Sequence, residues 1–147
     1  ILFGYAGNAL NEELGLIHQA KGDEEQKNNQ ENLTDWHLNT GSGSFKLRFD
    51  VSDPLCGGFR EEETVYLVGP LPLTESDNAR VVGNFGENAF LNGWCTEKEH
   101  LNGKPVLLYR KEDSGTKILM GIDPCYRRYV DATYRLMSNA VYLVGKE

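Results

Sequence analysis

The chain has 147 residues, of which 39% are hydrophobic and 25% are charged, and its formal net charge is −7. This length predicts a single domain over residues 1–147, large enough to fold without a metal or a disulfide network. The acidic balance argues against nonspecific binding to nucleic acid or to an anionic membrane surface, because both would repel the chain. The sequence also contains no apolar run as long as a transmembrane helix. Because the first residue is Ile1 rather than methionine, we interpret the chain as a processed form or a piece of a longer protein.

The first forty residues predict a short strand and one helix. Residues 1–6 are apolar and predict an entry strand. Leu10, Leu14 and Ile17 recur at helical spacing, which predicts a helix from about residue 8 to residue 20. The polar segment 21–32 either extends that helix or forms a loop, and the sequence leaves both possibilities open.

The clearest strand signal lies after the Gly-Ser turn at residues 41–44. Residues 45–51 alternate strictly, with apolar side chains at Phe45, Leu47, Phe49 and Val51 and charged side chains between them. This pattern predicts a half-buried strand of an antiparallel sheet that has one solvated face.

A five-residue sequence, Val-Tyr-Leu-Val-Gly, occurs twice, at residues 65–69 and at residues 141–145. Its β-branched, aromatic and aliphatic residues favour a strand that is buried on both faces. We therefore expect both copies to be core strands, possible neighbours in one sheet. Prolines at positions 70 and 72 are expected to end the first of them.

Three more strands and a second helix complete the prediction. We expect strands at residues 79–85, 105–110 and 116–122, with a hairpin turn at residues 112–115 between the last two. Asp123 and Pro124 have the residue types of an N-cap and a first helical position, so a helix should begin there and end near residues 138–139. Successive strands without intervening helices predict an α+β fold, in which one or two helices cover an antiparallel sheet of five to seven strands.

The segment 86–103 is predicted to be a long loop and is the leading candidate for a binding site. Long ordered loops often bind ligands, and a tryptophan beside amide and carboxylate groups suits sugar recognition. In a sugar complex an aromatic ring stacks on the sugar face while amides and carboxylates hold hydroxyl groups. The alternative is that Trp94 fills the core, since tryptophans are mostly buried. The expected contact residues are Phe90, Asn92, Trp94, Glu97 and His100.

The three cysteines, Cys56, Cys95 and Cys125, fit one disulfide with one free thiol in an exported protein, or three thiols in a cytoplasmic one. We favour export, to a secreted or periplasmic location, with a Cys95–Cys125 disulfide. A catalytic alternative makes Cys95 a nucleophile with His100 or His37 as the base and Glu97 as the orienting group. A disulfide at Cys95 would remove that alternative.

The sequence indicates neither a metal site nor a cofactor site, because the histidines and cysteines lack ligand spacings and the glycines lack nucleotide-binding motifs. Three functions stay open. The first is an extracytoplasmic, noncatalytic domain that binds a carbohydrate or a partner protein through residues 86–103. The second is a small cysteine- or histidine-dependent hydrolase or toxin-type domain. The third is an acidic inhibitor or immunity-type protein that contacts a basic partner through the acidic residues of segments 12–31 and 61–63.

Overall fold

The computed structural model describes residues 2–3, 41–70, 72–73, 78–96, 98–113, 115–125 and 131–145. The predicted helix at residues 8–20 and the acidic segment 21–32 lie outside these residues, as do His37 and Glu97. Within the described residues, no helix is long and apolar enough to span a bilayer.

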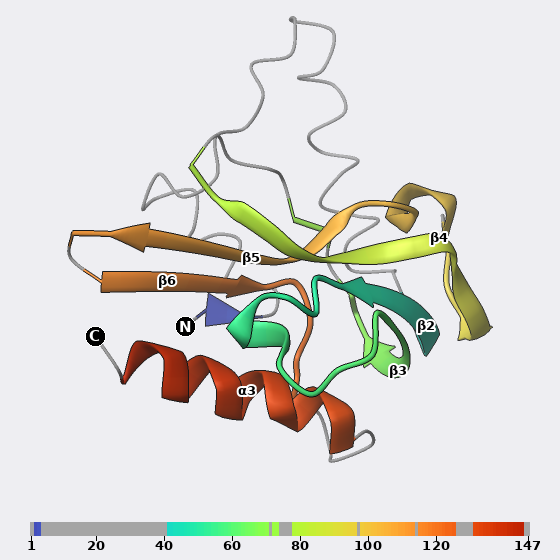
Figure 1. The fold of residues 1–147 in the computed structure, drawn as a ribbon. Coiled ribbons are helices and arrows are strands. Elements are labelled where there is room, and N and C mark those ends of the chain that lie inside the picture. Colours follow the sequence, from blue (N-terminus) through green and yellow to red (C-terminus); the bar gives the residue numbers. More distant parts are fainter. Residues whose placement is uncertain are drawn as a thin grey trace, which may run out of the picture.

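Six strands form one curled sheet, which a C-terminal helix covers on one face (Figure 1). The five strands from β2 to β6 pair antiparallel, and short β1 pairs parallel with β6. The spatial order is β1-β6-β5-β4-β2-β3. This architecture confirms the predicted α+β class. The strands are β1 (Leu2–Phe3), β2 (Ser42–Phe49), β3 (Glu62–Val68), β4 (Arg80–Trp94), β5 (Pro105–Glu112) and β6 (Gly115–Met120), and the helix is α3 (Asp131–Val144).

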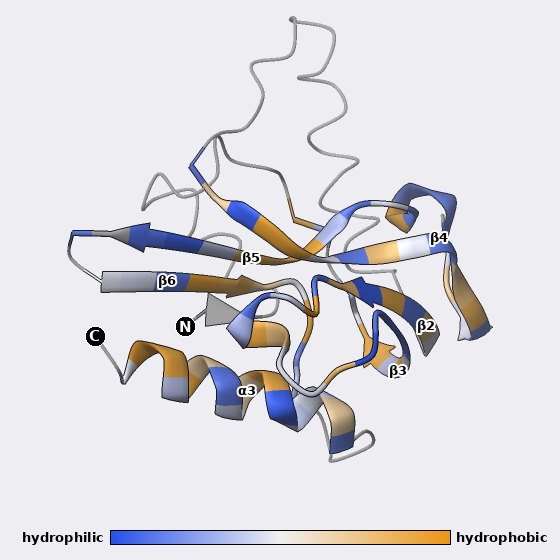
Figure 2. Cartoon of the chain, in the orientation of Figure 1, coloured by the Kyte–Doolittle hydropathy of each residue, from blue (hydrophilic) through white to orange (hydrophobic). Residues whose placement is uncertain are grey.

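The main hydrophobic core lies between the inner face of the sheet and α3, together with the short 3-10 helix η2 (Pro54–Cys56). On the inner face of the sheet, the buried rings of Phe45 and Phe85 meet edge to face, with centroids 6.2 Å apart. Helix α3 contributes Leu136 and Ala140, which are fully buried. Apolar and hydrophilic residues therefore alternate along the strands and around the helix (Figure 2).

The two halves of the sheet are buried differently. Leu107 of β5 belongs to the main core, whereas its neighbour Leu108 packs with Leu73 and Leu119 in a second cluster. Since successive strand residues point to opposite faces, β5 and β6 are buried on both sides. In β2, buried residues alternate with half-buried or exposed ones, as the alternation of residues 45–51 predicts. The strand ends at Phe49, however, and Val51 lies in the following turn, half exposed.

The two copies of the repeated pentapeptide adopt different structures, and the prediction that both are core strands is wrong. The first copy lies in β3 at an edge of the sheet, with Val65 and Leu67 buried but Tyr66 and Val68 exposed. The second copy forms the last turn of α3 and runs out to Gly145. Strand propensity is a weak preference, and burial of Leu136 and Ala140 against the core holds this segment as a helix instead.

The predicted loop at residues 86–103 is also wrong in its first half, because β4 continues as a strand through Trp94. A second 3-10 helix, η3 (Lys98–Leu101), forms most of what remains. At the predicted start of the second helix, the Cys125 amide donates to Asp123 Oδ1 at 2.9 Å, as an N-cap contact would require. The described helix begins at Asp131, and residues 126–130 lie outside the description.

Equivalent substitutions in the two pentapeptides should have opposite effects on stability. Val65 is 1% exposed in β3, so Val65→Ala should lower the free energy of unfolding by about 1–3 kcal/mol. Val141 is 59% exposed in α3, so Val141→Ala should leave it unchanged or raise it by about 0.5 kcal/mol, since alanine is the better helix former. Urea unfolding followed by circular dichroism measures both. Equal losses would mean that the second copy is packed like the first.

Candidate functional site

An irregularity in β4 shapes the end of the sheet where the sequence places its candidate site. Phe45 of β2 pairs with Phe90 and Leu47 pairs with Phe85, so two residues of β2 oppose five of β4. The extra residues are accommodated partly by Asn88, whose φ of 51° lies in the left-handed region that asparagine tolerates better than most residues. Because of this bulge, Phe85 and Phe90 both reach the inner face and contact Phe45.

Beyond the bulge, β3, β2 and β4 present a three-stranded outer face. Directly opposed residues of antiparallel strands share a face. Ser42 opposes both Val68 and Trp94, and Ser44 opposes both Tyr66 and Asn92. These side chains lie on the outer side because they alternate with the buried residues of β2 and β3. We call this surface the serine face; it consists of Ser42, Ser44, Tyr66, Val68, Asn92 and Trp94.

The serine face is apolar at its border and polar at its centre. Trp94 is 59% exposed, and Tyr66 and Val68 are exposed by 36% and 37%. Trp94 lies against Gly41, because a Cβ added at Gly41 would come within 2.5 Å of the Trp94 ring. The ring therefore packs on the backbone at one edge while much of it stays in solvent. The small side chains of the serines leave the middle of the face low between these larger groups.

The charged residues next to the serine face bind one another. Arg48 Nε donates to Glu62 Oε1 at 2.8 Å, and Lys46 Nζ lies 3.8 Å from Glu62 Oε2. The hydrogen bond from Arg48 is the main reason that the pKa of Glu62 is lowered. The face itself is therefore neutral, with balanced charges at the β2–β3 end away from Trp94.

A small pocket of about 110 Å³ lies beside the bulge, between β4 and η3. Its lining includes the Phe90 ring, with Lys98 Nζ 5.6 Å from the ring centroid in a cation–π contact. Asn102 Oδ1 accepts from the Ala89 amide at 2.9 Å and so ties η3 to the bulge. The volume is well below the roughly 300–1,000 Å³ of typical ligand sites, so the pocket suits a few water molecules.

The structure separates the predicted contact residues into two groups. Phe90 lies on the inner side, packed against Phe45, whereas Asn92 and Trp94 lie on the serine face. His100 is exposed on η3 and takes part in an interaction of its own. Ser42, Ser44, Tyr66 and Val68 were not predicted to belong to a site. The alternation of β2 and β3 places them on one face, but only the strand order shows that they adjoin Trp94.

The cysteines are all free thiols in the structure, so the Cys95–Cys125 disulfide is not formed there. It stays a prediction, as does export. Cys95 Sγ donates to the Thr96 carbonyl at 3.4 Å, and partial burial, with Glu99 as a secondary cause, raises the pKa of the Cys95 thiol. Nucleophilic cysteines need a lowered pKa, which supplies the thiolate, so this environment gives no support to catalysis at Cys95.

The burial of each thiol predicts a definite labelling pattern with iodoacetamide. Cys56 is fully buried, and burial raises the pKa of its thiol to about 12. We expect Cys95 and Cys125 to be alkylated in the native protein and Cys56 only after unfolding. Intact-mass measurement without and with reductant checks this. Two labels without reductant would agree with the structure, whereas one or none would reveal a disulfide.

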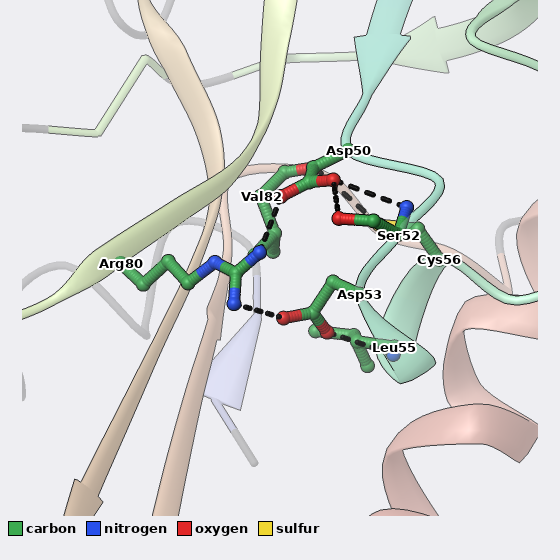
Figure 3. A network of polar contacts seen from close by, with 7 residues as sticks. All are labelled: Asp50, Ser52, Asp53, Leu55, Cys56, Arg80 and Val82. Carbon is green, nitrogen blue, oxygen red and sulfur yellow. Dashed lines mark hydrogen bonds and ion pairs between the residues drawn. The ribbon is translucent and has the colours of Figure 1, made fainter.

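A polar network around Arg80 is the densest cluster of charged side chains in the described structure (Figure 3). Arg80 of β4 binds Asp50 at 2.5 Å and Asp53 at 3.4 Å, both of which lie just after β2. Asp53 is buried, and its Oδ1 accepts from the Leu55 amide at 2.9 Å as the N-cap of η2. Asp50 also accepts from the amide and the hydroxyl of Ser52.

This network holds η2 against the sheet rather than forming a reactive site. The Val82 carbonyl accepts both the Asp50 amide, at 2.9 Å, and the Cys56 thiol, at 3.4 Å. The carboxylates therefore already have donors, and the thiol has an acceptor. Among the described residues no group of three or more His, Cys, Asp or Glu side chains is placed to hold a metal ion.

The network predicts part of the dependence of stability on pH. Hydrogen bonds from Ser52 and Arg80 lower the pKa of Asp50. A lowered folded-state pKa stabilises the protein above the unfolded value of about 3.9, and this contribution is lost as the pH falls through the folded value. Asp50→Asn should therefore lower the urea midpoint at neutral pH, and its difference from the wild type should shrink below about pH 4. The exposed Glu87→Gln is the control, and a constant difference down to about pH 2 would contradict the assignment.

No protein-family model matches this chain, and a search of curated proteins finds no significantly similar sequence.

Proposed function

We propose that this protein is a noncatalytic, extracytoplasmic binding domain whose serine face contacts a carbohydrate. The observation that carries the proposal is the exposed Trp94, which shares a rung of the sheet with Ser42 and Val68. The next rung places the Asn92 amide beside Ser44 and Tyr66. A secreted or periplasmic location is part of this proposal, because carbohydrate ligands of this kind lie outside the cell.

The chemistry of the face suits a neutral sugar. The apolar faces of sugar rings stack on aromatic side chains, which Trp94 supplies at one side and Tyr66 at the other. Serine hydroxyls donate and accept, and an asparagine amide does both through separate atoms, so the centre can match alternating sugar hydroxyls. Because Arg48 and Lys46 already bind Glu62, the charges near the face do not select an ionic ligand.

The geometry favours binding over the other two functions considered. The raised pKa of the Cys95 thiol is opposite to what a cysteine nucleophile needs. For the acidic inhibitor, Glu62 is bound by Arg48, and Glu63 Oε1 accepts from the Arg60 amide at 3.1 Å. Two of the three acids in segment 61–63 are thus engaged within the chain, which weakens their case as contacts for a basic partner.

The proposal is tested by calorimetric titration with neutral tetrasaccharides: cellotetraose, laminaritetraose, mannotetraose and chitotetraose. We expect at least one to bind the wild type. Trp94→Ala should weaken that binding at least about tenfold, because the stacking surface is lost. Ser42→Ala and Ser44→Ala should each weaken it about two- to tenfold, the value of one hydrogen bond.

Tyr142→Ala is the matched control, because Tyr142 is an exposed aromatic residue on α3, away from the serine face. It should bind as the wild type does. Failure of all four sugars, or equal affinity of the Trp94→Ala variant, would overturn the carbohydrate assignment. Capture of a protein ligand that Trp94→Ala abolishes would keep the face as a binding surface and reject the sugar.

A further inference from the structure

Strand β3 ends the sheet on one side and has an unusually regular edge. Its pairing with β2 runs through seven consecutive residue pairs, from Ser42 with Val68 to Arg48 with Glu62, without a register shift. By contrast, the pairing between β2 and β4 contains two shifts. In the described sheet no strand pairs with the other side of β3. Its outer edge is thus a straight seven-residue template for another strand.

The sequence of β3 lacks the devices that usually protect such an edge. Proteins block edge strands with lysine, proline, bulges or very short strands. Residues 62–68 contain no proline, lysine or glycine, and the second half of the strand is entirely apolar or aromatic. Its acidic residues are confined to the beginning, at Glu62 and Glu63.

We propose that a second copy of this chain pairs with β3 antiparallel, about a two-fold axis at Val65. This is the register in which all seven residues of both strands are paired. It also keeps the two faces matched, since buried Val65 opposes its own copy and outward Val68 opposes outward Glu62 of the second copy. A shift by one residue would place buried positions opposite exposed ones.

Charge favours this orientation over the parallel one. In a parallel pair, each Glu62 would lie beside Glu62 of the other copy, and like charges on neighbouring strands destabilise a sheet. In the antiparallel pair the acidic ends lie far apart, and each Glu62 is already bound by Arg48 of its own chain. The resulting two-fold contact uses the same surface on both copies and therefore closes as a dimer.

A two-fold axis through an edge pair runs perpendicular to the sheet, so both serine faces would lie on the same side of one continuous sheet. Two linked faces bind a repeating ligand more tightly than one face does. Only this consequence rests on the proposed carbohydrate function. The dimer is argued from strand geometry and charge alone, and it is measured without any ligand.

Sedimentation equilibrium over a range of protein concentrations, in about 0.15 M salt to screen the net charge of each copy, tests the dimer. The wild-type mass should rise from 16.5 kDa toward twice that value with concentration. Val68→Glu places a carboxylate opposite Glu62 at both symmetric positions, so the dimer dissociation constant should rise about tenfold or more. Val68→Lys places an ammonium group there instead, and the dissociation constant should stay equal or fall.

The opposite effects of the two substitutions at Val68 identify the register, because lysine at an edge ordinarily blocks pairing. Val144→Glu is the matched control. Val144 occupies the same position of the second pentapeptide, is 38% exposed against 37% for Val68, and lies on α3. A wild-type mass that stays at the monomer value at every concentration would overturn the proposal. Equal weakening by all three substitutions would also overturn it, and would place the contact elsewhere.

Discussion

The structure depends on the bulge in β4, where five residues of this strand oppose two of β2. Without the extra residues, Phe85 and Phe90 could not both contact Phe45, and the aromatic part of the core would lose one ring. The same bulge sets the direction of everything beyond it, so that Asn92 and Trp94 lie opposite the two serines of β2. Core packing and the composition of the serine face thus follow from one irregularity, held in part by the left-handed Asn88.

Regular features of the fold could be read from the sequence, and irregular ones could not. Strict alternation identifies β2, and the hairpin between β5 and β6 follows from its turn residues. The bulge interrupts the alternation of β4 with glycine and asparagine, which resemble loop residues and conceal the strand. The pentapeptide shows the larger limit. Identical local sequences form a strand and a helix, because their neighbours bury different faces.

The candidate site was predicted in part, for a related reason. Trp94 and Asn92 were identified as contact residues from their chemistry, yet Phe90, four positions before Trp94, lies on the opposite side of the sheet. Adjacency in sequence therefore misled, because a pleated strand with a bulge divides its residues between two environments. Tyr66 and Val68 reach the site through strand order, and Ser42 and Ser44 through register. Pairing of distant strands is information that a single sequence does not carry.

The parallel contact between β1 and β6 has a consequence for how the chain folds. Leu2 pairs with Leu119, so this contact closes a loop of 117 residues, the difference between the two positions. The hairpin of β5 and β6 closes almost at once, and β2 with β3 closes within a few tens of residues. Since loop closure costs more entropy as the loop lengthens, and β1 offers only two residues in return, we expect it to dock last. The chain would then acquire most of its sheet before its amino-terminal strand is in place, an order that pulsed hydrogen exchange can follow.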